Sequence, residues 1–121
     1  MSNPNIVQVA SIYGNTSIQL VSTSATAIVA NSNDSNKVYK INSVIVSNVD
    51  ASNSATLTVD LYRGSTAYRL IRNVTIGVNT SYTPIDKTLS IYLIEGDSIR
   101  LTASANNRLE AIASWEEISH V

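Results

Sequence analysis

Apolar and polar residues alternate with a period of two along most of the chain, and this pattern predicts β-strands. The alternation is clearest over residues 55–61, 99–105 and 109–115, where one face of each strand should be buried. Residues 38–49 are β-branched around a continuous apolar run, which is typical of a strand covered on both faces. The strands predicted on these grounds cover residues 6–13, 17–22, 25–30, 38–49, 55–61, 67–76, 85–94, 99–105 and 109–115.

One of these segments, residues 67–76, carries a charge at an inward position. Tyr68, Leu70, Val74 and Ile76 are its expected inward side chains, and Arg72 falls in phase with them. A charged side chain in that phase predicts either a β-bulge that shifts the register or a place for this arginine at an oligomer interface.

The C-terminal segment, residues 107–118, can also be written as a short helix, because Leu109, Ile112 and Trp115 are spaced three apart. The strand interpretation uses the two intervening alanines as well and continues the preceding phase, so it is preferred. Trp115 is then the one bulky core anchor among small inward side chains.

Turn residues separate the predicted strands and indicate a single all-β domain. Residues 31–37 are the most loop-like segment, and residues 79–84 are a predicted loop in which Pro84 marks an edge or a strand start. Short strands joined by short turns predict an antiparallel β-sandwich or jelly roll, with a small barrel as the alternative. Residues 37–121 would form the sandwich body, and residues 1–36 would supply N-terminal strands and an arm.

Composition narrows the classes of partner. Eight Lys and Arg oppose nine Asp and Glu with no block of like charge, which disfavours a nucleic-acid partner. No apolar stretch approaches the length of a membrane span, and the N-terminus lacks the basic and apolar regions of a signal peptide, so we expect a soluble protein. The chain has no cysteine, so disulfides and thiolate chemistry are absent.

Candidate chemistry centres on the acidic turn Glu95-Gly96-Asp97. Two carboxylates flanking a glycine could bind a hard cation or serve a glycosidase, but no calcium-loop motif surrounds them. The preferred interpretation is a structural turn in which Gly96 adopts a positive φ and Asp97 bonds its own backbone. His120, the single histidine, lies next to the C-terminus, where a catalytic base would be unusual. We therefore predict no enzymatic activity, no metal and no cofactor.

Charged residues at the end of the last strand are candidate interface positions. Glu116 and Glu117 could pair with Arg100 or Arg108 across strands, or could join Arg72 at a contact with a neighbouring subunit. So small a net charge also permits self-association.

Aromatic and amide side chains offer an alternative function, because aromatic faces stack on sugars. An exposed cluster of Tyr13, Tyr82, Asn79 and Asn106 would form a glycan-binding module for receptor recognition.

Two stretches resemble small structural proteins of tailed bacteriophages, including cyanophages. They are "VYKINSVIVSNVDASNSATLTVDLYRG", residues 38–64, and "IDKTLSIYLIEGDSIRLTASANNRLEAIASWEEI", residues 85–118. In that group an "I-x-L-x-E-G-D-x-I" turn precedes a small-residue strand and a closing "S-[YW]-E-E-I" strand. The matching residues here are Leu93, Glu95, Gly96, Asp97, Ile99, Ser114, Trp115, Glu116, Glu117 and Ile118.

The resemblance implies a β-sandwich virion component that is assembled in the host cytoplasm. It implies a capsid decoration or cement protein that stabilises the particle, with a neck or tail accessory protein as an alternative. The expected partners are copies of the chain itself, as a trimer or other cyclic homo-oligomer, and virion proteins such as the major capsid protein.

Overall fold

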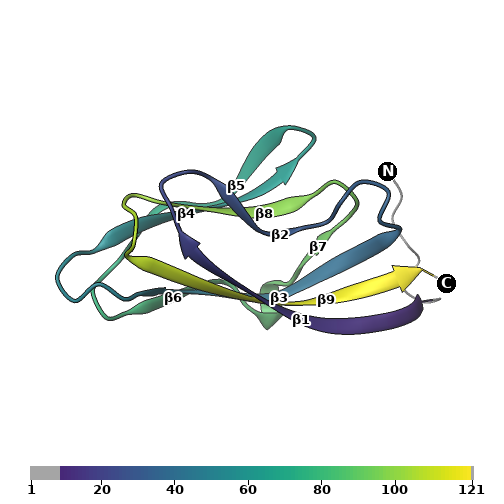
Figure 1. Ribbon diagram of the computed structural model, residues 1–121, viewed down its shortest axis with the longest axis horizontal. Helices are drawn as coiled ribbons and strands as arrows, with labels where there is room; N and C mark the ends of the chain where they lie inside the picture. Colours follow the sequence, from purple (N-terminus) through teal and green to yellow (C-terminus); the bar gives the residue numbers. More distant parts are fainter. Residues whose placement is uncertain (1–8, 121) are drawn as a thin grey trace.

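The computed structural model describes residues 9–120, which form two antiparallel sheets packed face to face (Figure 1). The five-stranded sheet has the order β1-β9-β3-β6, with β7 also paired to β3. Its strands are β1 (Val9–Val21), β3 (Lys37–Asn48), β6 (Ser81–Ile85), β7 (Ile91–Leu93) and β9 (Leu109–His120). The four-stranded sheet has the order β2-β8-β4-β5, formed by β2 (Thr26–Ala30), β4 (Ala55–Arg63), β5 (Thr66–Ile76) and β8 (Ser98–Ala103).

The strand pairing is that of a jelly roll. β1 pairs with β9, β2 with β8, β3 with β6 and β7, and β4 with β5, all antiparallel. The first strand thus pairs with the last, the second with the last but one, and so on toward the middle of the chain. This nested order is that of two Greek keys. The predicted all-β sandwich is confirmed, and the two separate sheets exclude the small barrel.

The core lies between the two sheets and is built from the predicted alternation. Residues 55, 57, 59, 99, 101, 103, 109, 111 and 113 are all buried, and their neighbours on each strand point outward. The segment 107–118, for which a helix was the alternative, belongs to the β8–β9 turn and to β9. Its period-two pattern thus reports strand geometry, with small alanines facing the opposite sheet.

β1 and β2 are integral strands of the two sheets. β1 pairs with β9 along its length, from Val9 opposite His120 to Val21 opposite Leu109, and β2 pairs with β8. Residues 9–30 thus complete both sheets of the body that was expected at residues 37–121. The rest of the predicted arm, residues 1–8, lies outside the described residues.

The predicted loop 79–84 and the predicted strand 85–94 are both wrong, because β6 occupies residues 81–85 and only the short strand β7 follows within residues 86–94. β6 ends at Ile85, a 3-10 turn follows at η2 (Lys87–Leu89), and β7 begins at Ile91. Asp86 caps the turn, since its Oδ1 accepts from Thr88 N at 2.9 Å. Pro84 lies within β6, which is an edge strand, as the missing N–H requires.

β5 contains bulges, which explain the phase of Arg72. Its register against β4 shifts twice, once on either side of the Val59–Ile71 pair. Asn73 has a φ of 53° and no register partner on β4, and its backbone N–H donates to Thr58 Oγ1 at 3.1 Å instead. The bulge predicted at Arg72 is therefore confirmed.

The same bulges overturn part of the expected inward set of β5. Tyr68 and Leu70 are exposed, whereas Ile71 packs against the core. Val74 is half-buried and Ile76 is buried, as expected. Each extra residue moves the following side chain to the opposite face, so a strict period of two cannot locate the inward side chains here.

Candidate functional site

The acidic turn between β7 and β8 has the predicted geometry. Gly96 has a φ of 87°, and a Cβ built on it would lie 2.8 Å from Asn33 Oδ1. Ile94 N donates to Asp97 Oδ2 at 3.0 Å, and Asp97 N donates to Ile94 O at 3.1 Å. Both the backbone conformation and the close approach of Asn33 therefore favour glycine at position 96.

Asp97 also binds an arginine that the sequence analysis did not connect to the turn. Arg63, the last residue of β4, donates from Nε at 2.9 Å and from Nη2 at 2.6 Å to the two carboxylate oxygens. This bidentate hydrogen bond to Asp97 raises the pKa of Arg63 above its ordinary value. The Asp97 side chain is fully buried and the Arg63 side chain is 41% exposed, so the pair closes over the end of the sandwich.

Backbone bonds tie the same turn to the loop between β2 and β3. Gly96 N donates to Asn31 O and Asn31 N donates to Asp97 O, each at 2.8 Å. Glu95 is buried, and its Oε2 accepts from Asn36 N at 2.6 Å. The turn therefore joins three segments, and both of its carboxylates are engaged in holding the fold. Both residues also line a small hollow with Asn33 and Tyr62, but the hydrogen bonds from Asn36 N, Arg63 and Ile94 N already occupy their carboxylates, which disfavours a glycosidase pair.

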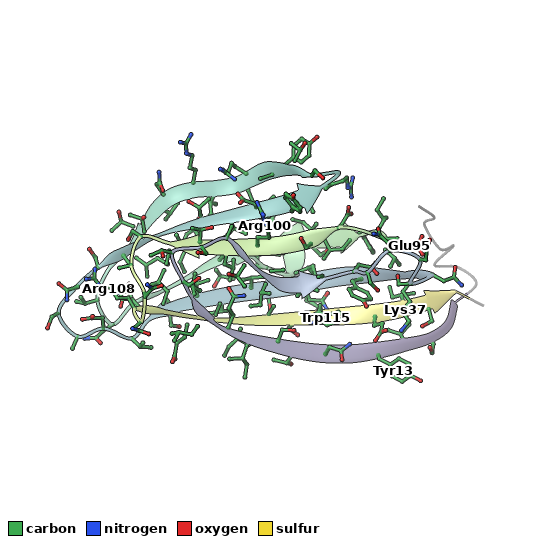
Figure 2. The ribbon with its side chains drawn as sticks, turned by 45° about the horizontal axis from the view of Figure 1, so that its top comes forward. Tyr13, Lys37, Glu95, Arg100, Arg108 and Trp115 are labelled. Carbon is green, nitrogen blue, oxygen red and sulfur yellow. The ribbon has the colours of Figure 1, made fainter. Side chains whose placement is uncertain are left out.

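Trp115 lies at the border of the core, where three strands meet (Figure 2). Its ring packs against the buried cluster and lies 4.5 Å from the ring of Tyr39 on β3, with the planes tilted by 36°. Its Nε1 donates to Ser17 Oγ on β1 at 3.0 Å. The indole is half-buried and so links β1, β3 and β9 from the edge of the interior.

The two glutamates after Trp115 pair with β3. Glu117 forms an ion pair with Lys37, and this hydrogen bond raises the pKa of Lys37 above its ordinary value. Glu116 accepts from Asn42 Nδ2 at 3.0 Å. Burial raises the pKa of the neighbouring Tyr39 hydroxyl as well.

The pairing predicted for these glutamates with Arg100 or Arg108 is wrong. Arg100 belongs to β8 in the other sheet, and Arg108 lies in the β8–β9 turn at the opposite end of the molecule from Lys37 (Figure 2). Sequence spacing could not separate these positions, because only the strand order places β3 beside β9.

An apolar row crosses the outer face of the five-stranded sheet. Ile18 on β1 lies opposite Ile112 on β9, and Ile112 lies opposite Ile45 on β3. These isoleucines are 78%, 47% and 41% exposed, and Leu20, two residues along β1 on the same face, is 53% exposed. Cross-strand neighbours sit about 5 Å apart, so the four side chains form one contiguous patch, called the outer row below.

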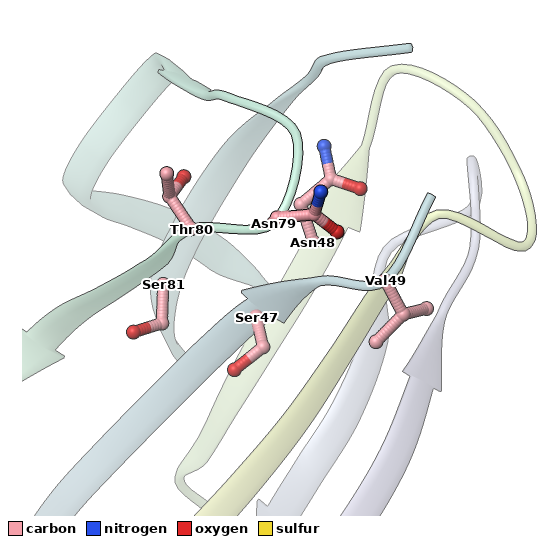
Figure 3. Close-up of a pocket in the computed structure, with 6 residues that line it drawn as sticks. All are labelled: Ser47, Asn48, Val49, Asn79, Thr80 and Ser81. Atoms are coloured by element: carbon pink, nitrogen blue, oxygen red, sulfur yellow. The ribbon is translucent and has the colours of Figure 1, made fainter. Parts of the chain in front are cut away.

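A shallow polar hollow lies where β3 ends and β6 begins (Figure 3). Asn48 N donates to Thr80 O at 2.8 Å across its floor. The lining side chains are short and uncharged: Ser47, Asn48, Val49, Asn79, Thr80 and Ser81. The hollow thus offers hydrogen bonds but no group for acid–base or metal chemistry.

The exposed cluster predicted for glycan binding does not form. Tyr13 lies on β1 and Tyr82 on β6, the two opposite edges of the five-stranded sheet, with β9 and β3 between them. Asn106 lies in the β8–β9 turn, where its Oδ1 accepts from Thr23 N at 3.0 Å. These side chains therefore cannot stack on one sugar.

Residues 9–120 offer neither a three-residue metal cluster nor a membrane-spanning helix. No three His, Cys, Asp or Glu side chains in this part of the chain are arranged to hold a metal ion. No helix among the described residues is long and apolar enough to cross a bilayer. The His120 side chain and residue 121 lie outside what the structure describes.

Comparison with known proteins gives a likeness in fold but none in sequence family. No family model matches the chain, and no curated protein matches it. A solved structure of Bacillus endospore appendages, described as a novel family of disulfide-linked pili, is similar with a TM-score of 0.54 and 15% sequence identity. The match covers 100% of this chain and 98% of that chain, so the likeness in fold extends over both in full.

This finding overturns the function predicted from the sequence. The structural likeness is to a pilus protein, so the assignment as a virion component that decorates a capsid or serves in a neck or tail is wrong. The glycan-binding alternative is wrong as well, because the residues predicted to form its site are dispersed over the fold. The β-sandwich architecture stands. The virion location and the resemblance to phage proteins stay predictions.

Proposed function

We propose that this chain is a non-enzymatic structural subunit that assembles with copies of itself into an extended, pilus-like polymer. The likeness to a pilus protein over the whole of both chains supports this function. The engagement of Glu95 and Asp97 within the fold supports the absence of catalysis, because those side chains were the candidate acid–base pair.

The outer row is the observation that carries the proposal. Complete burial of one large aliphatic side chain stabilises by about 1.5–3 kcal/mol. The exposed fractions of Ile18, Ile45, Ile112 and Leu20 together equal about two such side chains, so covering the row would contribute about 3–6 kcal/mol. A contact of this size is weak alone and becomes effective when repeated along a polymer.

Contacts between subunits must be non-covalent in this proposal. The similar pili are described as disulfide-linked, whereas this chain has no cysteine. An open fibre further requires that the outer row meet a different surface of the next copy, because a contact between two identical rows closes into a dimer. The trimer or cyclic oligomer expected from the sequence is thus replaced by a heterologous, open arrangement.

Sedimentation velocity and negative-stain electron microscopy of the purified protein test the proposal. The wild type should form filaments whose fraction rises with protein concentration, and Ile18→Thr/Ile112→Thr should remain monomeric at the same concentrations. Tyr68→Thr is the matched control, because Tyr68 is comparably exposed, at 56%, on the other sheet.

Two results would count against the proposal. A wild type that stays monomeric up to its solubility limit refutes self-assembly. Filaments that form equally well with the double variant refute the outer row as the contact. The double variant should fold normally, since surface substitutions usually change stability by about 0.5 kcal/mol or less.

A further inference from the structure

Three arginines and one buried aspartate line a groove on the outer face of the four-stranded sheet. Asp60 on β4 lies opposite Arg69 on β5 and opposite Arg100 on β8. The side chain of Asp60 is 2% exposed, so the flanking guanidinium groups cover it. Together with Arg72 these residues line an open groove of about 350 Å³, whose other lining residues are Ala25, Thr58, Asn73 and Thr102.

The bulges of β5 bring Arg69 and Arg72 to the same groove. Residues three apart on a regular strand point to opposite faces. Here the register shifts around Ile71 add residues to β5, and both arginines line one groove as a result. The bulges thus turn Arg72 toward the face that carries Arg69.

Neither of the two ion pairs of Asp60 forms an aligned hydrogen bond. Arg69 Nη1 lies 2.7 Å from Asp60 Oδ1 as an ion-pair contact without hydrogen-bond alignment, and Arg100 Nη2 lies 3.7 Å from Oδ2. The ion pair of Arg63 with Asp97 differs, because both of its contacts are 2.9 Å or less and are aligned hydrogen bonds.

Donor capacity therefore remains in the groove. Arg100 is stacked 3.9 Å over the ring of Tyr62, which holds its guanidinium group at the groove. Arg72 is exposed and forms no ion pair with any residue from 9 to 120. Three guanidinium groups facing one carboxylate leave the groove with an excess of two positive charges.

We propose that this groove is a binding site for an oxyanion, either a carboxylate or a phosphate. A guanidinium group presents parallel N–H donors that match two oxygens of either anion. Arg72 supplies a guanidinium group that has no ion-pair partner among the described residues. Arg69 is held in place by Asp60 and Arg100 by Asp60 and Tyr62, and both contribute their outward N–H groups. Thr58, Asn73 and Thr102 add neutral polar groups at the rim.

Titration of the ¹⁵N-labelled protein tests the site. Inorganic phosphate and acetate are added separately at constant ionic strength, with chloride as the balancing anion. Signals of the Nε–H groups of Arg69, Arg72 and Arg100 and of the Asn73 backbone should shift together, with saturation on the order of millimolar concentrations. A stronger response to phosphate identifies a free tetrahedral anion as the source, and a stronger response to acetate identifies a carboxylate. Either result supports the site.

Charge-matched variants separate the groove from the general charge of the surface. Arg72→Gln should weaken binding by about 10-fold or more, because one charge-assisted pair is lost. Lys87→Gln removes the same charge from the exposed turn η2 and should leave binding unchanged. Asp60→Asn should tighten binding several-fold by removing the competing carboxylate.

Two outcomes overturn the proposal: no localised shift with either anion, or equal weakening by Arg72→Gln and Lys87→Gln. If Asp60→Asn does not fold, the comparison of the two cation variants still decides. The site is independent of self-assembly, so the monomeric outer-row variant should bind the anion as the wild type does.

Discussion

Replacing Arg63 by Met should destabilise the fold more than replacing its partner Asp97 by Asn. In the wild type, Asp97 is fully buried and accepts from Arg63 twice and from Ile94 N once. Arg63→Met leaves a buried carboxylate with one remaining donor, and breaking a buried pair from one side costs about 3–5 kcal/mol. The large cost reflects the charge left without compensation.

The reverse substitution leaves a different side chain behind. Asp97→Asn keeps an oxygen for Ile94 N, and Arg63, whose side chain is 41% exposed, can turn to water. The expected loss is about 1.5–3 kcal/mol, the value of hydrogen bonds to a charged group. The double variant should then lose at least about 1 kcal/mol less than the two single losses together, because the two residues are in contact.

Urea unfolding, followed by circular dichroism and by the fluorescence of the single tryptophan, measures the free energy of unfolding of each variant. Arg108→Met is the matched control: its ion pair with Asp50 spans 3.8 Å between partly exposed side chains, and it should cost about 1 kcal/mol or less. Additivity of the single losses within about 0.5 kcal/mol would refute the coupling. A cost for Arg63→Met equal to that of Arg108→Met would refute the argument from burial.

Two further predictions concern the core border and the acid limit of stability. Trp115→Ala should lower the free energy of unfolding by about 2–4 kcal/mol, which is below the range for a fully buried indole because the ring is half-buried. A loss under about 0.5 kcal/mol in urea unfolding would place Trp115 outside the packed interior. Hydrogen bonds from the Ser52 backbone to Asp50, and from the Thr88 hydroxyl to Asp86, lower the pKa values of both carboxyl groups below their ordinary 3.8. As the pH falls, these carboxyl groups take up protons in the unfolded chain before they do so in the folded one, so Tm in scanning calorimetry should fall as pH drops below 3.8. Asp86→Asn should make Tm depend less steeply on pH in this range, and an unchanged dependence would contradict the role given to Asp86.

The alternation of apolar and polar residues was sufficient to predict the sandwich wherever a strand is regular. In β4, β8 and β9 every second side chain enters the core, because a strand with one covered face exposes the other to water. The glycine of the acidic turn was equally predictable, since its φ of 87° strongly favours a residue without Cβ.

Prediction failed where the backbone departs from a constant period. The bulges in β5 exposed Tyr68 and Leu70, and the turn capped by Asp86 interrupts the expected strand 85–94, of which only Ile85 and β7 are extended. A single extra residue reverses every later side chain, and nothing in the local composition states which residue is the extra one.

The chain by itself determined an all-β, cysteine-free domain with little net charge and an acidic turn built around Gly96. These properties follow from local periodicity and residue chemistry. Only the tertiary structure decided which residues meet: Arg63 on Asp97, the two arginines on Asp60, and the isoleucines of the outer row. In a jelly roll each sheet is made from strands far apart in the chain, so its faces and ion pairs come from strand order, which the pattern along one strand does not contain.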